Sequence, residues 1–239
     1  MANLFSFGLN ILADILYPKY CFGCGRAVGY LCKFCIKKLP FNIKNLCIVC
    51  NKLSTNGITH TQCKNNFLPN RLLSAFPYKN KIVRDMIITG KYYFVSEIFY
   101  LLGKFGAFVL LQNQSSLSQF EVFDFTLCPI PLHIRRKNWR GFNQSEVICQ
   151  AMSEVFEIPY QNILVRTKNT KTQKDLSAPE RQSNMQNAFA ISKDFFGNIP
   201  HKVILIDDVT TTGKTFLEAT RVLKQAGVQE VWCVSLAKD

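Results

Sequence analysis

The hydrophobic pattern after Pro69 alternates between short apolar runs and longer helical segments. Residues 72–78, 203–206 and 230–236 read as strands, and a further apolar run at 122–130 ends in prolines. The run at 203–206 has no polar alternation, which is typical of a strand buried on both faces. Residues 81–91, 95–111, 144–156 and 215–226 read as helices. This order of elements predicts an α/β domain with a mainly parallel sheet.

The first 17 residues have a different pattern. Apolar residues from Phe5 to Leu16 recur at spacings of three and four, which predicts one apolar helix face, and Pro18 ends the helix. This face either packs on the rest of the protein or docks on a membrane surface or a partner, although its polar side has no Lys or Arg. No secretory signal and no apolar run of about 20 residues is visible, so we expect a cytoplasmic protein without a transmembrane segment, with the inner face of the membrane as a further location.

Cysteine spacing is the first clue to chemistry. The chain has 10 cysteines, and three C-x2-C pairs lie close together near its start. In the cytoplasm such clusters are more typical of metal ligands than of disulfides, redox pairs or buried free thiols. Two C-x2-C turns supply the four thiolates that structural Zn²⁺ prefers. The simplest pairing predicts a zinc site formed by Cys21, Cys24, Cys32 and Cys35.

A second metal site is a weaker prediction. Cys47, Cys50 and Cys63 remain after the first site is assigned, and His60 is close enough in sequence to be a fourth ligand. His60 is equally compatible with an ordinary surface loop, because its neighbours are polar.

The charge of the chain is unevenly distributed. The net charge is +13, and residues 1–70 hold eight Lys and Arg side chains against the single acid Asp14. Composition therefore suggests a basic cysteine-rich domain at residues 1–68 and an α/β domain at 69–239. Lys33 and Lys37, with aromatic residues between the basic ones, suit single-stranded nucleic acid, although a solvated basic surface would look the same.

The most informative stretch is the Val203–Thr215 segment, Val-Ile-Leu-Ile-Asp-Asp-Val-Thr-Thr-Thr-Gly-Lys-Thr. A buried strand leads into the acid pair Asp207 and Asp208, and a Thr-rich loop with Gly213 then opens a helix. The amides of a helix start suit a phosphate, and the acids suit sugar hydroxyls or a hydrated Mg²⁺. The predicted ligand is therefore a sugar phosphate.

These 13 residues resemble the phosphoribosyl pyrophosphate (PRPP) motif of type I phosphoribosyltransferases. The resemblance implies that Asp207 and Asp208 are the catalytic pair and contact the ribose hydroxyls, with Mg²⁺ bound together with PRPP. It also implies that the loop holds the 5′-phosphate, through Thr210, Thr211, Thr212, Gly213, Lys214 and Thr215.

The resemblance extends to the ComF family over almost the whole chain. Residues 129–144, residues 172–189 and the cysteine pairs all resemble that family, which joins a zinc ribbon to a phosphoribosyltransferase-like domain. In the family Cys63 usually opens a fourth pair, whereas position 66 is Asn66 here. The resemblance places Pro131 and Leu132 where such proteins hold pyrophosphate, and makes residues 166–187, with Arg181, a loop that closes over PRPP.

The basic run after His133 has two readings. Its side chains suit either a pyrophosphate or a nucleic-acid backbone, and a solvated helix start is the plainer alternative. We assign nucleic-acid contact to Arg135, Arg136, Lys137 and Arg140.

The sequence therefore predicts a ComF-like competence protein that binds PRPP and single-stranded DNA during DNA uptake, with phosphoribosyl transfer left open. The resemblance implies a DNA-import helicase or channel protein as a further partner. Two other functions stay open: a metabolic phosphoribosyltransferase that makes a nucleotide from a free base, and a non-catalytic PRPP-sensing adaptor. The acceptor of any transfer has no visible motif.

Overall fold

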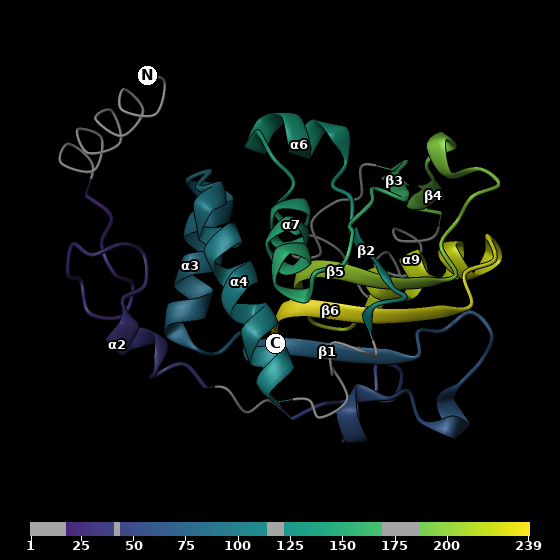
Figure 1. The fold of residues 1–239 in the computed structure, drawn as a ribbon, viewed down its shortest axis with the longest axis horizontal. Coiled ribbons are helices and arrows are strands. Elements are labelled where there is room, and N and C mark those ends of the chain that lie inside the picture. The colour runs from purple at the N-terminus through teal and green to yellow at the C-terminus, as the bar shows by residue number, and fades with distance from the viewer. Residues whose placement is uncertain (1–17, 41–43, 114–121, 169–186) are drawn as a thin grey trace, which may run out of the picture.

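A computed structural model describes residues 18–40, 44–113, 122–168 and 187–239 (Figure 1). The predicted helix before Pro18, and Arg181 with most of its loop, lie outside these residues. Within them, a four-stranded sheet has the order β1-β6-β5-β2, and every neighbouring pair is parallel. The strands are β1 Arg71–Pro77, β2 Thr126–Pro129, β5 Lys202–Thr210 and β6 Glu230–Lys238.

Helices cover both faces of this sheet. On one face lie α3 Lys81–Tyr92, α4 Ser96–Asn113 and α7 Gln144–Phe156, and on the other lies α9 Lys214–Gln225. Alternate strand residues supply the two cores, so Ile204 and Ile206 face the first group while Val203 and Leu205 face α9. The α/β prediction with a mainly parallel sheet is confirmed.

Two strands and two helix starts show how the sequence sets local structure. β5 and β6 both extend beyond their apolar runs. The two strands stay paired past the acid pair, and Asp207 lies opposite Ser235. The helices α3 and α7 begin at Asn80 and Asn143, whose side chains accept hydrogen bonds from backbone amides of the first turn. A small antiparallel pair, β3 Leu164–Arg166 and β4 Phe189–Ile191, was not expected from the pattern.

The cysteine-rich segment packs on both sides of the sheet domain. Its short helix α2 Lys33–Ile36 lies beside α3 (Figure 1), and Cys21, Cys32 and Cys35 belong to the core that α3, α4 and α7 share. Ile48 belongs to the opposite core, with Phe216 of α9. The boundary between residues 68 and 69 stays a prediction, but each half of the segment has a separate anchor on the sheet domain.

Candidate metal and PRPP sites

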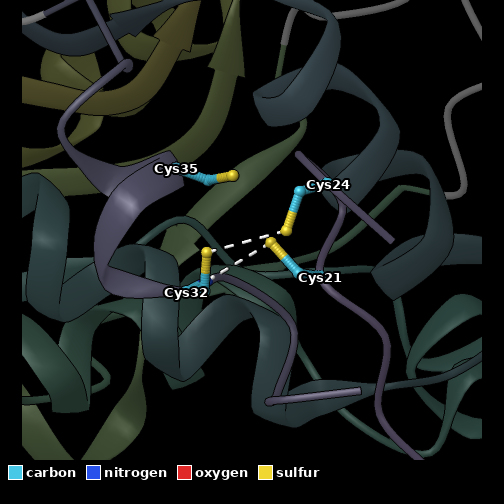
Figure 2. Close-up of side chains that lie close together, drawn as sticks. All are labelled: Cys21, Cys24, Cys32 and Cys35. Atoms are coloured by element: carbon cyan, nitrogen blue, oxygen red, sulfur yellow. Dashed lines mark hydrogen bonds between the residues drawn. The ribbon is translucent and has the colours of Figure 1, made fainter. Parts of the chain in front are cut away.

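The first cysteine cluster consists of Cys21, Cys24, Cys32 and Cys35, whose sulfur atoms all lie within 4.8 Å of one another (Figure 2). Backbone amides of Gly23 and Cys32 point at the Cys21 sulfur, each at 3.4 Å. A Cβ on Gly23 would lie 2.5 Å from the Cys35 sulfur, so only glycine leaves room for the sulfurs to converge. The donor set fits tetrahedral Zn²⁺.

The thiol pKa values support a cation at this cluster. A hydrogen bond from the Arg26 side chain lowers the pKa of Cys24 to about 6, whereas burial and the neighbouring thiols raise the pKa of Cys35 to about 12. Four crowded thiols cannot all ionise without a positive charge between them. A metal ion supplies that charge and holds all four as thiolates.

The second cysteine cluster consists of Cys47, Cys50, His60 and Cys63, again with ligand atoms within 4.8 Å of one another. His60 Nδ1 lies 3.3 Å from the Cys50 sulfur, and its Nε2 lies 3.0 Å from the carbonyl oxygen of Leu53. A carbonyl only accepts, so Nε2 donates to Leu53 and Nδ1 presents its lone pair to the cluster. This arrangement is typical of a metal-ligating histidine.

Position 66 has no part in the second cluster. The structure places His60 where a fourth thiolate would otherwise be needed, which gives a three-cysteine, one-histidine donor set suited to structural zinc. The structure thus brings together all eight residues that the sequence proposed as ligands. The two groups fit the metal by donor type and spacing.

The acid pair lies near the carboxyl end of β5. Asp208 is buried and Asp207 is half-buried. Ser145, at the start of α7, donates its hydroxyl hydrogen bond to Asp207 Oδ1 at 2.9 Å. Burial and the neighbouring charge of Asp208 raise the pKa of Asp207 to about 7, although Ser145 opposes the shift. Such enclosed acids favour hydroxyl or cation partners.

Lys91 is a site residue that the sequence analysis missed. Its Nζ lies 2.8 Å from Asp208 Oδ2. This contact is an ion pair between a half-buried ammonium and a buried carboxylate. Burial works against the charge of Lys91, but the nearby Asp208 raises its pKa overall. Lys91 comes from the last turn of α3, and no sequence motif marks it.

Two arginines also approach the acid pair. Arg140 ends the short helix α6 Ile134–Arg140 and interacts electrostatically with Asp208. Arg166 ends β3, interacts with Asp207, and has its pKa lowered by burial and then by Arg136. With Lys91, these arginines give the site more positive than negative charge, which suits a polyanion.

The Thr-rich loop follows β5 directly. Thr211 and Thr212 are exposed, and Gly213 has φ +72° and precedes α9. Gly213 has no side chain to cap the helix, so the first amides of α9 are not occupied by a cap. The loop therefore has the donors that a phosphate requires.

Ile48, in the turn between Cys47 and Cys50 of the second cysteine cluster, packs against this loop. A Cβ on Gly213 would lie 2.9 Å from Ile48 Cγ1, and Ile48 is 6% exposed. Gly213 is thus required twice, for its positive φ and for the close approach of the cysteine turn. The turn between Cys47 and Cys50 therefore packs against the start of α9.

The predicted pyrophosphate stretch lies after β2. Pro131 and Leu132 are half-buried, and the preceding Ile130 accepts a hydrogen bond from the Asn143 side chain at 3.1 Å. His133 begins α6, and its Nδ1 accepts from the Arg135 amide. His133 is therefore the cap of α6.

The basic residues assigned to nucleic acid fall into two groups. Arg135 and Lys137 are exposed on α6, Arg136 is half-buried, and Lys137 pairs with Glu146 at 3.3 Å. Lys33 and Lys37 are exposed at the two ends of α2. The structure places these two groups on separate elements.

A surface hollow of about 470 Å³ lies elsewhere, lined by residues such as Asn66, Asn70 and Lys224. Asn70 precedes β1 and Gln229 precedes β6, so the hollow is at the amino ends of the strands. Ligands of open parallel sheets bind at the carboxyl ends, where the acid pair lies.

Comparison with known proteins identifies the families that the two parts of the chain resemble. Residues 143–239 match the phosphoribosyl transferase domain family, and residues 12–64 match the double zinc ribbon domain family. The chain is 41% identical over 116 residues to competence protein F of Haemophilus influenzae, which is 47% of this chain and 49% of that protein. The chain belongs to the ComF family.

Other relatives extend this family match. The DNA utilization protein YhgH of Escherichia coli K12 is 38% identical over 108 residues, 44% of this chain and 46% of that protein. Competence protein ComFC of Bacillus subtilis is 24% identical over 213 residues, 87% of this chain and 79% of that protein. The chain thus spans about half the length of the first two relatives that it matches.

The chain aligns only weakly with the solved structure of another protein. A glutamine PRPP amidotransferase of B. subtilis aligns with TM-score 0.36 and 16% identity, over 82% of this chain and 32% of that one. In the part of the chain that the structure describes, no helix is long and apolar enough to cross a membrane.

Proposed function

We propose that this ComF-family chain binds PRPP and single-stranded DNA and acts in the handling of incoming DNA during natural transformation. The observation that carries the PRPP part is the acid pair at the end of β5, directly followed by an uncapped Thr-Gly loop and faced by Lys91. The DNA part rests on the basic residues of α2 and α6 and on the relatives named for competence and DNA utilization.

Each part of the site has a distinct task in binding PRPP. The amides and hydroxyls of 211–215 hold the 5′-phosphate, and Asp207 and Asp208 accept hydrogen bonds from the ribose hydroxyls. Lys91 and Arg140 attract the pyrophosphate. Pro131 and Leu132 lie in the half-buried stretch that borders it, and Arg181, which lies outside the described residues, is a further candidate contact. Mg²⁺, bound with PRPP, neutralises the pyrophosphate.

If the bound PRPP reacts, the chain's residues act by position and charge. A nucleophilic atom of the acceptor would form a bond to ribose carbon 1 as the bond from that carbon to the pyrophosphate oxygen breaks and pyrophosphate leaves. The oxocarbenium-like transition state is positively charged, so the carboxylates of Asp207 and Asp208 stabilise it electrostatically. Asp207 and Asp208 are therefore the residues whose loss affects both binding and turnover. Zinc has a structural task here, because its ligands are all supplied by the protein.

The ribbon and α6 supply the charge for DNA. Lys33 and Lys37 flank α2, and Arg135 and Lys137 are exposed on α6. Phosphate contacts of this kind make affinity fall steeply as salt rises. A cytoplasmic location, where incoming single strands arrive, is part of this proposal, and an import helicase or channel protein is the partner it implies.

The test is a calorimetric titration of the wild-type protein with PRPP and Mg²⁺, repeated with Asp207→Asn/Asp208→Asn. We expect binding in the wild type and its loss in the double variant, with an unchanged melting temperature as the folding control. Absence of binding in the wild type would contradict the PRPP part. Product formation from PRPP and a free base would favour a metabolic enzyme instead.

A further inference from the structure

A group of exposed aromatic side chains lies beside the candidate PRPP site. Tyr92, Tyr93 and Phe94 follow one another at the end of α3, and their exposed fractions are 59%, 74% and 44%. Trp139, in the last turn of α6, is 60% exposed. Large aromatic residues gathered on one surface are uncommon in monomers and mark interaction sites.

Phe94 and Trp139 pack against each other and are not two isolated exposed residues. Their ring centroids are 4.9 Å apart with the planes at 81°, the edge-to-face geometry that aromatic rings prefer. Phe94 has φ +61°, which a bulky residue rarely adopts. Strained backbone of this kind is concentrated at ligand-binding sites. Here the strained residue is the one whose exposed ring packs on Trp139.

The same two elements supply cations to the acid pair. Lys91, three residues before Phe94, is the ion-pair partner of Asp208, and Arg140, next to Trp139, interacts with the same carboxylate. The aromatic pair therefore borders the candidate PRPP site, because Phe94 lies three residues after Lys91, which contacts Asp208, and Trp139 directly precedes Arg140. Exposed Arg135 and Lys137 lie on the same helix as Trp139.

We propose that Phe94 and Trp139, flanked by Tyr93, form a base-stacking platform for single-stranded DNA at the mouth of the PRPP site. Basic side chains for phosphates beside exposed rings for bases are the combination by which proteins bind single strands. A duplex does not fit this chemistry, because its bases are already stacked. The positive charge of α6 favours a polyanion over an apolar protein partner. This inference rests on the DNA part of the proposed function.

The chain offers a direct probe of this platform. It has two tryptophans, and Trp232 is 4% exposed and covered by the Arg71 guanidinium, 4.2 Å from its ring centroid. Changes in tryptophan emission on adding a ligand therefore report mainly on Trp139. We would titrate the full chain with an oligothymidine of about 15 nucleotides and with an abasic strand of equal length.

We expect the oligothymidine to quench the emission and the abasic strand to leave it unchanged. Affinities of the variants and of the abasic strand are measured by fluorescence anisotropy of a labelled strand, because Trp139 is absent from the variants. Trp139→Ala should weaken oligothymidine binding about tenfold, and Trp139→Phe should keep most of the affinity, since stacking requires a ring and not an indole. Ile134→Ala is the matched control, because Ile134 is 59% exposed on the same helix and has no ring. Melting temperatures of all variants check their folding.

Two results separate failure of the platform from failure of the proposed function. Equal, salt-dependent binding of both strands, with Trp139→Ala like the wild type, overturns the platform and leaves the DNA part of the proposed function standing. No binding of either strand overturns both. The PRPP titration is independent of these measurements, so it reports on the candidate PRPP site in either case.

Discussion

The two cysteine clusters both suit structural zinc, one with four cysteines and the other with three cysteines and a histidine, but their surroundings differ. The first cluster packs into the core that α3, α4 and α7 share, and three of its four cysteines are buried. The second cluster has three half-buried ligands, and its turn residue Ile48 packs against Gly213 at the start of α9. The comparison suggests that the first cluster stabilises the fold, whereas the second shapes the phosphate loop.

The largest expected effect is on stability, at the first cluster. Cys35→Ser removes a buried ligand, so the bound zinc no longer contributes its folding free energy. We expect the melting temperature to fall by about 10 °C or more. Scanning calorimetry measures this, and PRPP affinity at a temperature where the variant is folded should change little. A loss of PRPP binding without loss of stability would reverse the comparison.

Cys50→Ser should weaken PRPP binding more than it lowers stability. Loss of this ligand releases His60 and the turn that holds Ile48, so the phosphate loop loses its support. We expect a smaller fall in melting temperature and PRPP binding about tenfold weaker by calorimetry. Zinc content, measured on the same sample, should fall by one ion of two. Unchanged PRPP affinity with one zinc lost would break the proposed coupling.

Ile48→Ala tests the contact without touching a ligand. The smaller side chain leaves a gap behind Gly213, and we expect PRPP affinity to fall on the order of fivefold with zinc content unchanged. Val49→Ala is the matched control, because Val49 is in the same turn and 43% exposed. Equal behaviour of the two variants would show that the contact has no effect on the loop.

The smallest expected effect concerns the surface beside the first cluster. Lys19 pairs with Glu97 of α4 at 2.7 Å, and both side chains are partly exposed. Exposed ion pairs contribute about 1 kcal/mol or less, so Lys19→Ala should lower the melting temperature by about 4 °C at most. Chemical denaturation with Glu97→Ala and the double variant would isolate the pair. A larger loss would mean that Lys19 anchors the ribbon.

Much of this structure could be predicted from local sequence patterns. The apolar runs and the helical spacing predicted the parallel sheet and its main helices. The spacing of the cysteines and of His60 predicted the two groups of four ligands. Contacts between residues far apart in the sequence could not be predicted in this way. Lys91 reaches Asp208 from a helix more than a hundred residues earlier, and no local pattern marks such a pairing. Phe94 and Trp139 meet in the same way.

We propose that the second cluster orders the candidate phosphate loop at residues 211–215 and that the first cluster does not. Hydrogen–deuterium exchange of the 211–215 amides tests it most directly, in the wild type, Cys24→Ser and Cys50→Ser. We predict faster exchange of these amides in Cys50→Ser alone. Equal exchange in all three proteins, or faster exchange only in Cys24→Ser, would contradict the claim.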